Sequence, residues 1–314
     1  MSDKIKVDIL TSALNEEECL PELFSRLKQV FLSEKDYEFR IIIIDNGSTD
    51  NTWEIIKDNC DFNENILGYR MSRNFSLDAA FTCGLDKASG DLAIIMTSDL
   101  QDPPESIPAL LREYENGFDQ VLVKIANRDS VPFIRRFLSV VFYKIASRMT
   151  AGMLPKSVSD FRLVSRKTYL AIRTLRESHR FLRGLGSWVG FSTTYIEIDR
   201  PKRFAGESKW IGMSLATVIA QASRSIMAYS ALPLMFISFL GVFLSLSSLL
   251  FLVISAFVWI ISGVPFAGYG SIVGLIALGF SLTMLAIGIL AQYLGLIYEE
   301  VKQRPLYIIS DETK

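Results

Sequence analysis

The chain has 314 residues, of which 50% are hydrophobic and 21% charged, and its formal net charge is -1. A charge so close to zero gives no general affinity for nucleic acid. The single histidine leaves little scope for a histidine-dependent catalytic triad, and the sequence has neither a Walker A motif nor a dinucleotide fingerprint of the right spacing. Three cysteines, Cys19, Cys60 and Cys83, lack metal-ligand spacing and are expected to be reduced packing residues.

Short β-rich apolar runs alternate with amphipathic helical segments through the first part of the chain. The predicted strands span residues 5–12, 39–45, 66–71, 92–98 and 119–124. The predicted helices span residues 16–33, 51–60, 76–88 and 104–117. This alternation is typical of a Rossmann-like α/β fold, with a mostly parallel sheet and helices on both faces. Ligands of such sheets bind beyond the carboxyl ends of the strands, so the loops that follow the strands are the first candidates for a site.

Polar clusters follow three of the predicted strands. They are Ala13-Leu14-Asn15-Glu16-Glu17, Asp45-Asn46-Gly47-Ser48-Thr49-Asp50 and Ser98-Asp99-Leu100-Gln101-Asp102. The first two have a structural alternative, because Asn, Ser, Thr and Asp commonly cap helices and acidic residues favour the first helical turn. In the third, Asp99 and Gln101 place two oxygen donors two residues apart, which suits Mg²⁺ or Mn²⁺ shared with substrate phosphates. Three clusters at successive strand ends favour a site over chance turns.

From Ser225 to Tyr298 the chain contains no charged residue. Two helices need about 40 residues to cross a hydrocarbon core of about 30 Å twice, so residues 229–300 are predicted to form two transmembrane helices with a turn near Gly263-Val264-Pro265. Basic residues flank only the outer ends, which predicts an integral membrane protein with its catalytic domain and both termini in the cytoplasm. The alternative, two buried helices of a soluble core, fits less well because soluble helices usually have a polar face.

Further segments are assigned by their place relative to the membrane. Residues 131–149 combine an apolar side with basic residues, which is typical of a helix lying in the membrane interface. Residues 209–228 are predicted to form a juxtamembrane amphipathic helix, and residues 301–314 a cytoplasmic tail. For residues 131–149 the alternative is an ordinary amphipathic helix packed on the sheet.

Several motifs together carry a family resemblance. Besides the three clusters, they include Asp160-Phe161-Arg162-Leu163 and the run from Arg203 to Lys209. Residues 1–208 resemble a family 2 glycosyltransferase of the GT-A type, in the polyprenyl-phosphate group that includes dolichyl-phosphate mannose synthases and bactoprenol glucosyltransferases. The resemblance covers essentially the whole chain, and the terminal hairpin points to the bactoprenol branch. It implies an α/β GT-A domain attached to a two-helix transmembrane hairpin.

The resemblance also implies roles for individual residues. Those implied in binding the donor nucleotide are Ala13, Glu16, Asp45, Ser98, Asp99 and Lys124. Those implied in binding donor or acceptor phosphates are Arg162, Arg200, Arg203, Ser208 and Lys209. Asp99 and Gln101 would hold the divalent metal, and Asp160 would join Asp99 as a catalytic residue by orienting donor or acceptor. Two structural alternatives stay open: an ion pair between Arg162 and Asp160, and membrane anchoring by the basic residues.

The sequence departs from the family pattern at three positions. Thr97 stands where relatives carry the first aspartate of an Asp-x-Asp motif, which leaves Asp99 with Gln101. Asn46 replaces a frequent second aspartate, and Leu14 replaces a frequent aromatic residue. These changes bear on metal affinity and base stacking and leave the rest of the site in place.

The implied reaction transfers a monosaccharide to undecaprenyl phosphate at the cytoplasmic membrane face, with inversion at C1. UDP-glucose is the first choice of donor, ahead of other UDP sugars and GDP-mannose. An acceptor phosphate is mostly ionised near neutral pH and needs no strong general base. Two alternatives are a processive polysaccharide synthase and an inactive membrane scaffold, which the missing first aspartate favours. Small residues would let hairpins pack closely as a homo-oligomer: Gly274, Gly279, Gly288 and Ala291.

Overall fold

The structure is a computed structural model that describes residues 4–126, 158–178, 180–201, 203–205, 232–262 and 268–313. The chain divides into two compact units. One comprises Met1–Val218 together with Arg304–Lys314, and the other comprises Ile219–Gln303. The first unit therefore contains residues from both ends of the sequence.

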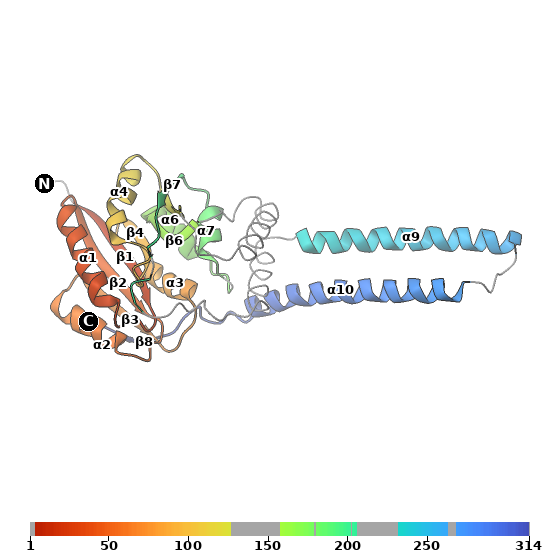
Figure 1. Ribbon diagram of the computed structural model, residues 1–314, viewed down its shortest axis with the longest axis horizontal. Helices are drawn as coiled ribbons and strands as arrows, with labels where there is room; N and C mark the ends of the chain where they lie inside the picture. The colour runs from red at the N-terminus through yellow and green to blue at the C-terminus, as the bar shows by residue number, and fades with distance from the viewer. Residues whose placement is uncertain are drawn as a thin grey trace. The chain divides into compact units, whose positions relative to one another are not determined.

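The described part of the first unit is organised by one sheet in the order β7-β5-β6-β4-β1-β2-β3-β8 (Figure 1). The strands are β1 (Ile5–Ala13), β2 (Tyr37–Asp45), β3 (Ile66–Met71), β4 (Leu92–Thr97), β5 (Gln120–Ile125), β6 (Val158–Ser165), β7 (Thr193–Ile198) and β8 (Ile309–Glu312). Strands β4, β1, β2 and β3 are parallel neighbours, as are β5 and β7. Strands β6 and β8 run antiparallel to their neighbours. The predicted mostly parallel α/β sheet is confirmed.

Helices connect the strands. They are α1 (Leu20–Ser33), α2 (Thr52–Phe62), α3 (Leu77–Lys87), α4 (Ile107–Glu115), α6 (Arg166–Thr174) and α7 (Leu182–Trp188), with a short 3₁₀ turn, η1 (Pro104–Ser106), before α4. The five predicted strands and four predicted helices are all present. The predicted start of the first helix at residue 16 is wrong, because Asn15 has a left-handed φ of 53° and a turn occupies the residues before Leu20.

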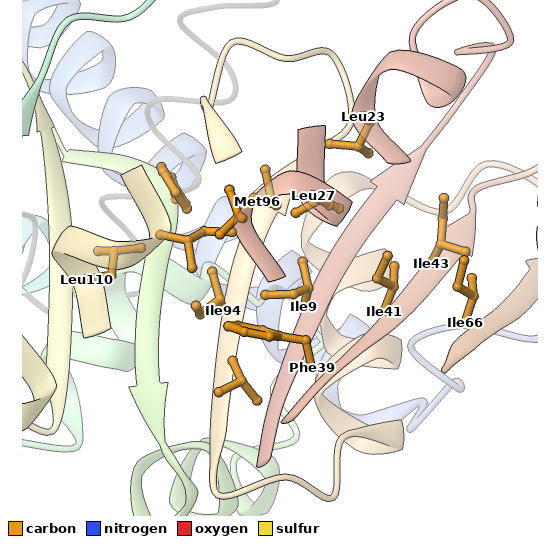
Figure 2. Close-up of a cluster of buried hydrophobic side chains, with 14 of the residues drawn as sticks. Ile9, Leu23, Leu27, Phe39, Ile41, Ile43, Ile66, Ile94, Met96 and Leu110 are labelled. Carbon is orange, nitrogen blue, oxygen red and sulfur yellow. The ribbon is translucent and has the colours of Figure 1, made fainter. Parts of the chain in front are cut away.

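The core explains why the strands are so regular. Residues 41–44 of β2 are four isoleucines that are at most 4% exposed, as expected for parallel strands covered on both faces. The buried face of α1 is formed by Leu20, Leu23, Leu27 and Val30. Figure 2 shows Leu23 and Leu27 in one cluster with sheet residues such as Ile9. This close packing holds the ends of β4, β1 and β2 in fixed positions.

Three strands were not expected from the sequence. The motif Asp160-Phe161-Arg162 lies on β6, whose Arg162 is in register with Ile95 of β4. Strand β7 pairs with β5. Strand β8 lies within residues 301–314, the segment described above as a tail, and pairs with β3. The C-terminal residues therefore belong to the same sheet as the N-terminal strands.

The second unit contains two long helices, α9 (Leu232–Ser262) and α10 (Tyr269–Val301). Among the described residues, the stretch Leu278–Val301 is long and apolar enough to cross a membrane. The helices expected at 131–149 and 209–228, and the turn expected at 263–265, lie outside the described residues.

Candidate functional site

The three polar clusters lie along one edge of the sheet. Strand register places Ala13 of β1 opposite Asp45 of β2, and Ser12 of β1 opposite Thr97 of β4. The loops that follow these strands are therefore neighbours at the carboxyl edge, where open α/β sheets bind ligands.

Asn15 joins the first loop to the second. Its backbone N–H donates to Ser48 Oγ at 2.9 Å, and its side-chain oxygen accepts from the N–H of Thr49 at 2.8 Å. The residue preceding α1 is Cys19, which makes no capping hydrogen bond through its side chain. The helix-cap interpretation of Asn15 is therefore wrong, and its left-handed backbone marks a position constrained by the site.

Asp45 is fully buried at the end of β2. Its Oδ1 accepts the N–H of Ser48 at 2.9 Å. Its Oδ2 lies 3.2 Å from Arg70 Nε but has no hydrogen-bond partner among the described residues. Buried carboxylate oxygens are normally satisfied, so Oδ2, which is paired in charge with Arg70, keeps the capacity to accept one more hydrogen bond.

The rest of the second loop is fixed by close backbone packing. Gly47 has a φ of +79°, and a Cβ there would lie 2.7 Å from the carbonyl carbon of Arg73. The Asn46 amide donates to the carbonyl of Ser76 and accepts from the N–H of Phe75. An ionised aspartate could not make the first of these bonds, which explains asparagine at this position.

The third loop turns sharply at Leu100, which has a φ of 59° and a buried side chain. Thr97 Oγ1 lies 2.7 Å from Asp99 Oδ1 and 2.8 Å from Asp102 Oδ2. The N–H of Gln101 also donates to Asp99 Oδ1, at 3.2 Å. Thr97, in the place of the first aspartate, thus orients Asp99 through a hydrogen bond.

Asp102 is only 1% exposed and links the loop after β4 to β6 and to Arg200. It accepts hydrogen bonds from the backbone N–H of Thr97 at 3.1 Å and from Ser159 Oγ at 3.2 Å, and its Oδ1 lies 3.5 Å from Arg200. Burial raises the pKa of Asp102 above its usual range, in spite of the opposing charge of Arg200. These contacts give it a structural role between β4 and β6.

The described residues offer few side chains that could hold a metal ion. No cluster of three or more Asp, Glu, His or Cys side chains suited to a metal occurs among them. Asp99 and Gln101 supply two oxygen donors on either side of a tight turn. Magnesium is commonly held by one or two carboxylates together with water and substrate phosphates, so this pair fits a cation shared with a diphosphate rather than a closed protein site.

Basic residues from the segment after β7 reach the same edge. Arg203 donates to Glu16 Oε1 at 2.6 Å and to the carbonyl of Ala205 at 2.7 Å. Glu16 is 6% exposed and precedes α1, whose first turn contains Glu22 instead. The N–H of Phe204 contacts the carbonyl of Asp99 at 3.4 Å. Ser208 and Lys209, expected to bind the acceptor phosphate, lie outside the described residues.

Asp160 is held by an arginine that sequence reasoning missed. Arg183 of α7 donates to both carboxylate oxygens of Asp160, at 2.7 and 2.6 Å. Burial favours the neutral form, but the charge and hydrogen bonds of Arg183 outweigh it and hold the pKa of Asp160 below its usual range. The contact depends on α7 packing beside β6, which residue spacing does not reveal.

Arg162 occupies a more enclosed position. It is 3% exposed and donates to the backbone carbonyls of Ser159, Asp160 and Leu182. Burial lowers the pKa of Arg162 to about 10. Its guanidinium lies 3.9 Å from Asp160, and this geometry favours the structural ion pair over a contact with phosphate.

The remaining candidate residues differ in how close they lie to this edge. Ala13 is fully buried and its carbonyl accepts the N–H of Asn46, while Ser98 Oγ donates to the carbonyl of Ser12. Lys124 lies on β5, which β6 separates from β4, and its ammonium is 4.0 Å from the ring of Tyr195. Ala13 and Ser98 lie behind the edge. Strands β4 and β5 both run antiparallel to β6, so Lys124, near the carboxyl end of β5, lies toward the same edge of the sheet.

Comparison with known proteins agrees with this geometry. The chain matches the model of glycosyl transferase family 2 over residues 8–172. An uncharacterized glycosyltransferase of Synechocystis sp. is 36% identical over 98% of this chain and 95% of its own. A bactoprenol glucosyl transferase of Shigella phage SfV is 35% identical over 98% of this chain and 99% of its own.

A solved structure shows the same fold at lower identity. The glucosyl-3-phosphoglycerate synthase of Mycobacterium tuberculosis, in complex with Mn²⁺, UDP and glucosyl-3-phosphoglycerate, gives a TM-score of 0.51 at 18% identity, over 71% of this chain and 78% of its own. The family match covers more than half of the sequence and includes all three loops of the carboxyl edge. The chain therefore belongs to glycosyltransferase family 2.

Proposed function

We propose that the protein transfers glucose from UDP-glucose to undecaprenyl phosphate, with inversion at C1, at the cytoplasmic face of a membrane. The observation that carries this proposal is the carboxyl edge of β4, β1 and β2, where Asp45 ends β2 and the loop that contains Asp99 and Gln101 follows β4. Its support is the identity of about a third, over nearly the whole chain, to proteins named bactoprenol glucosyl transferase.

The nucleotide would bind against Asp45. Its open Oδ2 would accept an N–H from the base, while Glu16 would face the ribose and Ser98 and Ala13 would support the loop behind them. A buried acceptor discriminates strongly between ligands that can and cannot donate to it. Uracil carries such an N–H in its ring, which agrees with a UDP-linked donor.

The diphosphate would lie over Asp99 and Gln101. A divalent metal bound there would neutralise the charge that develops on the leaving group. Thr97 fixes the Asp99 carboxylate through a hydrogen bond, and Leu100 anchors the turn in the core. The carboxylate of Asp99 would thus be held in place before substrate arrives.

The acceptor phosphate would approach the basic segment. Arg200, Arg203, Ser208 and Lys209 would neutralise it, and Arg203 would exchange its contact with Glu16 for a phosphate oxygen. The phosphate dianion is itself a sufficient nucleophile, since its second pKa is about 6. Asp160, oriented by Arg183, would then position donor or acceptor without having to accept a proton.

We further propose that α9 and α10 form a transmembrane hairpin. They contain 31 and 33 residues, so each is about 45 to 50 Å long at about 1.5 Å per residue, which exceeds a hydrocarbon core of about 30 Å. The chain leaves the unit that contains the sheet at Val218 and re-enters it at Arg304. The apolar part must therefore cross an even number of times, which keeps both termini on the side of the catalytic sheet.

Association of such hairpins into a homo-oligomer stays a prediction based on their small residues. The mass of the detergent-solubilised protein by light scattering tests it. A mass equal to one chain would contradict it.

The proposed reaction is tested with purified protein, radiolabelled UDP-glucose and undecaprenyl phosphate, in Mg²⁺ and in EDTA, with GDP-mannose in parallel. We expect label in the organic phase with UDP-glucose and Mg²⁺, and its loss in EDTA. Folded protein that gives no organic-phase label with any donor and either metal would overturn the proposal in favour of the inactive scaffold.

A further inference from the structure

The segment that follows the apolar helices is an integral part of the catalytic sheet. Strand β8 runs beside β3 (Figure 1). The N–H of Ser72 donates to the carbonyl of Ile308, and the N–H of Thr313 donates to the carbonyl of Gly68. Gly68 in turn donates to Thr313 Oγ1 at 2.8 Å. Residues 308–313 therefore cover the edge of β3, which would otherwise present unpaired backbone groups.

Side chains fasten this strand to helices on the sheet. The indole N–H of Trp53, a residue that is 2% exposed, donates to Asp311 Oδ2 at 3.2 Å. The Tyr307 hydroxyl donates to Asp86 at 2.8 Å. Residues 307–313 are thus bonded to α2 and α3 as well as to β3, which distinguishes this segment from a loosely attached tail.

The strand also borders a cavity beside the proposed nucleotide site. This cavity of about 410 Å³ is lined by Gly47 and Ser48, by residues 70–73, and by Ser310 and Asp311. Its volume lies within the range of about 300 to 1,000 Å³ that is usual for small-molecule sites. Three sequence-distant segments form its walls: the loop after β2, the end of β3, and β8.

Arg70 connects the cavity to the buried carboxylate of Asp45. Its Nε lies 3.2 Å from Asp45 Oδ2, and its Nη2 donates to the carbonyl of Ser48 at 3.1 Å. The carbonyl of Arg70 accepts from Ser310 Oγ at 3.2 Å. Arg70 therefore lies between Asp45 and Ser310 of β8, and a ligand bound to Asp45 would adjoin a residue that contacts the C-terminal strand.

We propose that β8 forms one wall of the donor-nucleotide site, with Ser310 and Asp311 facing the nucleoside part of a nucleoside diphosphate sugar. This inference rests on the proposed function. Hydroxyl groups, guanidinium groups and a carboxylate line the cavity, which suits the mixed donors and acceptors of a base and a ribose. The nucleotide site then combines residues that precede the membrane segment with residues that follow it, and is complete only when the C-terminal segment has joined the sheet.

The test uses protection of an introduced thiol in the full-length protein. The native thiols should react slowly with a maleimide, because Cys19, Cys60 and Cys83 are all buried and burial raises the pKa of each. Ser310→Cys places a thiol in the cavity wall. Glu312→Cys is the matched control on the same strand, because Glu312 is exposed, does not line the cavity, and pairs with Lys87 at the surface at 3.6 Å.

Maleimide labelling of both variants is measured with and without UDP and Mg²⁺. UDP at about ten times its Kd leaves about one site in eleven free, so labelling of Ser310→Cys should slow about tenfold while that of Glu312→Cys stays within about twofold. Equal rates with and without UDP for Ser310→Cys, in a sample that transfers sugar, would overturn this inference and leave the proposed function intact. Equal protection of both variants would also overturn it.

A second pair of variants tests the same assignment by measuring UDP binding without a thiol label. Ser310→Trp fills the cavity, and Glu312→Trp adds the same bulk outside it. We expect UDP to bind at least about tenfold more weakly to Ser310→Trp than to Glu312→Trp, by titration calorimetry. Equal affinities would contradict the assignment. A wild-type protein that neither binds UDP nor transfers sugar would overturn the proposed function and this inference with it.

Discussion

The two edges of the sheet use buried aspartates in opposite ways. Toward the amino edge, Asp8 of β1 is 2% exposed and accepts two hydrogen bonds from Arg40, both at 2.9 Å, and one each from the N–H groups of Ser89 and Gly90. At the carboxyl edge, Asp45 is equally buried, but its Oδ2 has only the charge of Arg70 at 3.2 Å and no hydrogen-bond partner among the described residues. A saturated carboxylate stabilises the fold, whereas an unsaturated one is held ready for a ligand.

Backbone geometry follows the same division. In the described part of the sheet-bearing unit, the non-glycine residues with positive φ are Asn15 and Leu100, which lie at the ends of β1 and β4. These positive φ angles cost conformational energy at the carboxyl edge, and the packing of the core offsets it. Asp8, which stabilises the fold, and the aspartates of the proposed site therefore lie at opposite edges of the sheet. Substitutions at one edge should change stability, and substitutions at the other should change activity.

The largest expected effect is on catalysis, from Asp99→Asn. This change removes the charge that faces the proposed metal while keeping the shape and the acceptor for Thr97. We expect sugar transfer to fall about 100- to 1,000-fold, the usual consequence of losing one preorganised charge-stabilising group. The unfolding temperature should stay close to that of the wild type. Transfer within about threefold of the wild type would contradict the role of Asp99.

At the opposite edge, Asp8→Ala should reduce stability and spare the chemistry. It removes four hydrogen bonds at a buried carboxylate and leaves Arg40, which is 30% exposed, without its partner, so we expect a loss of about 3 kcal/mol in the free energy of unfolding. Glu54→Ala is the control, since its ion pair with Lys57 is exposed and is expected to contribute less than about 0.5 kcal/mol. Denaturant unfolding measures both, and lost activity in folded Asp8→Ala protein would break the comparison.

Asp45→Asn is the counterpart at the carboxyl edge. The amide keeps an oxygen for the N–H of Ser48 but loses the charge and one acceptor, so we expect UDP to bind about 10- to 30-fold more weakly. Titration calorimetry on folded protein provides the value. A variant that loses stability like Asp8→Ala while binding UDP normally would show that the two edges do not differ as described.

The smallest effect concerns pH and Asp78. Burial and the neighbouring charge of Asp160 raise the pKa of Asp78 to about 6. A carboxyl whose pKa is higher in the folded protein than in the unfolded chain makes stability fall as pH rises between about 4 and 6, with no further change above that range. Asp78→Asn keeps an acceptor for the N–H of Leu182 and removes this titration.

We therefore expect Asp78→Asn to gain stability relative to the wild type, by about 1 to 2 kcal/mol, as pH rises from about 4 to 7. The difference between the two unfolding temperatures at each pH isolates this group from the other titrating residues. A difference that is constant with pH would count against the raised pKa.

Much of the fold could be predicted because its central strands are long apolar runs. The isoleucines of β2 and the loops after β1, β2 and β4 reveal both the sheet and its ligand-binding edge. Strand β7 was missed because none of its residues is fully buried, and β8 because four mostly exposed residues after a long apolar segment resemble a tail. Their pairing depends on tertiary contacts rather than on local pattern.

The residues of the candidate site were also predictable only in part. Asp45 and Asp99 follow predictable strands, so their position was foreseeable. The contributions of Arg70 and Arg183 were not, because each depends on which side chains meet across the fold. Arg162 shows the converse: its motif indicated phosphate binding, but β6 places its guanidinium in the interior among backbone carbonyls.

Mass spectrometry of the lipid product tests the central claim most directly. Wild-type protein incubated with UDP-glucose, undecaprenyl phosphate and Mg²⁺ is predicted to yield undecaprenyl phosphate carrying one hexose, with UDP released in equal amount. Free glucose alone, or a polymer of many sugar residues, would contradict the transfer of a single glucose to a lipid phosphate at the carboxyl edge of this sheet.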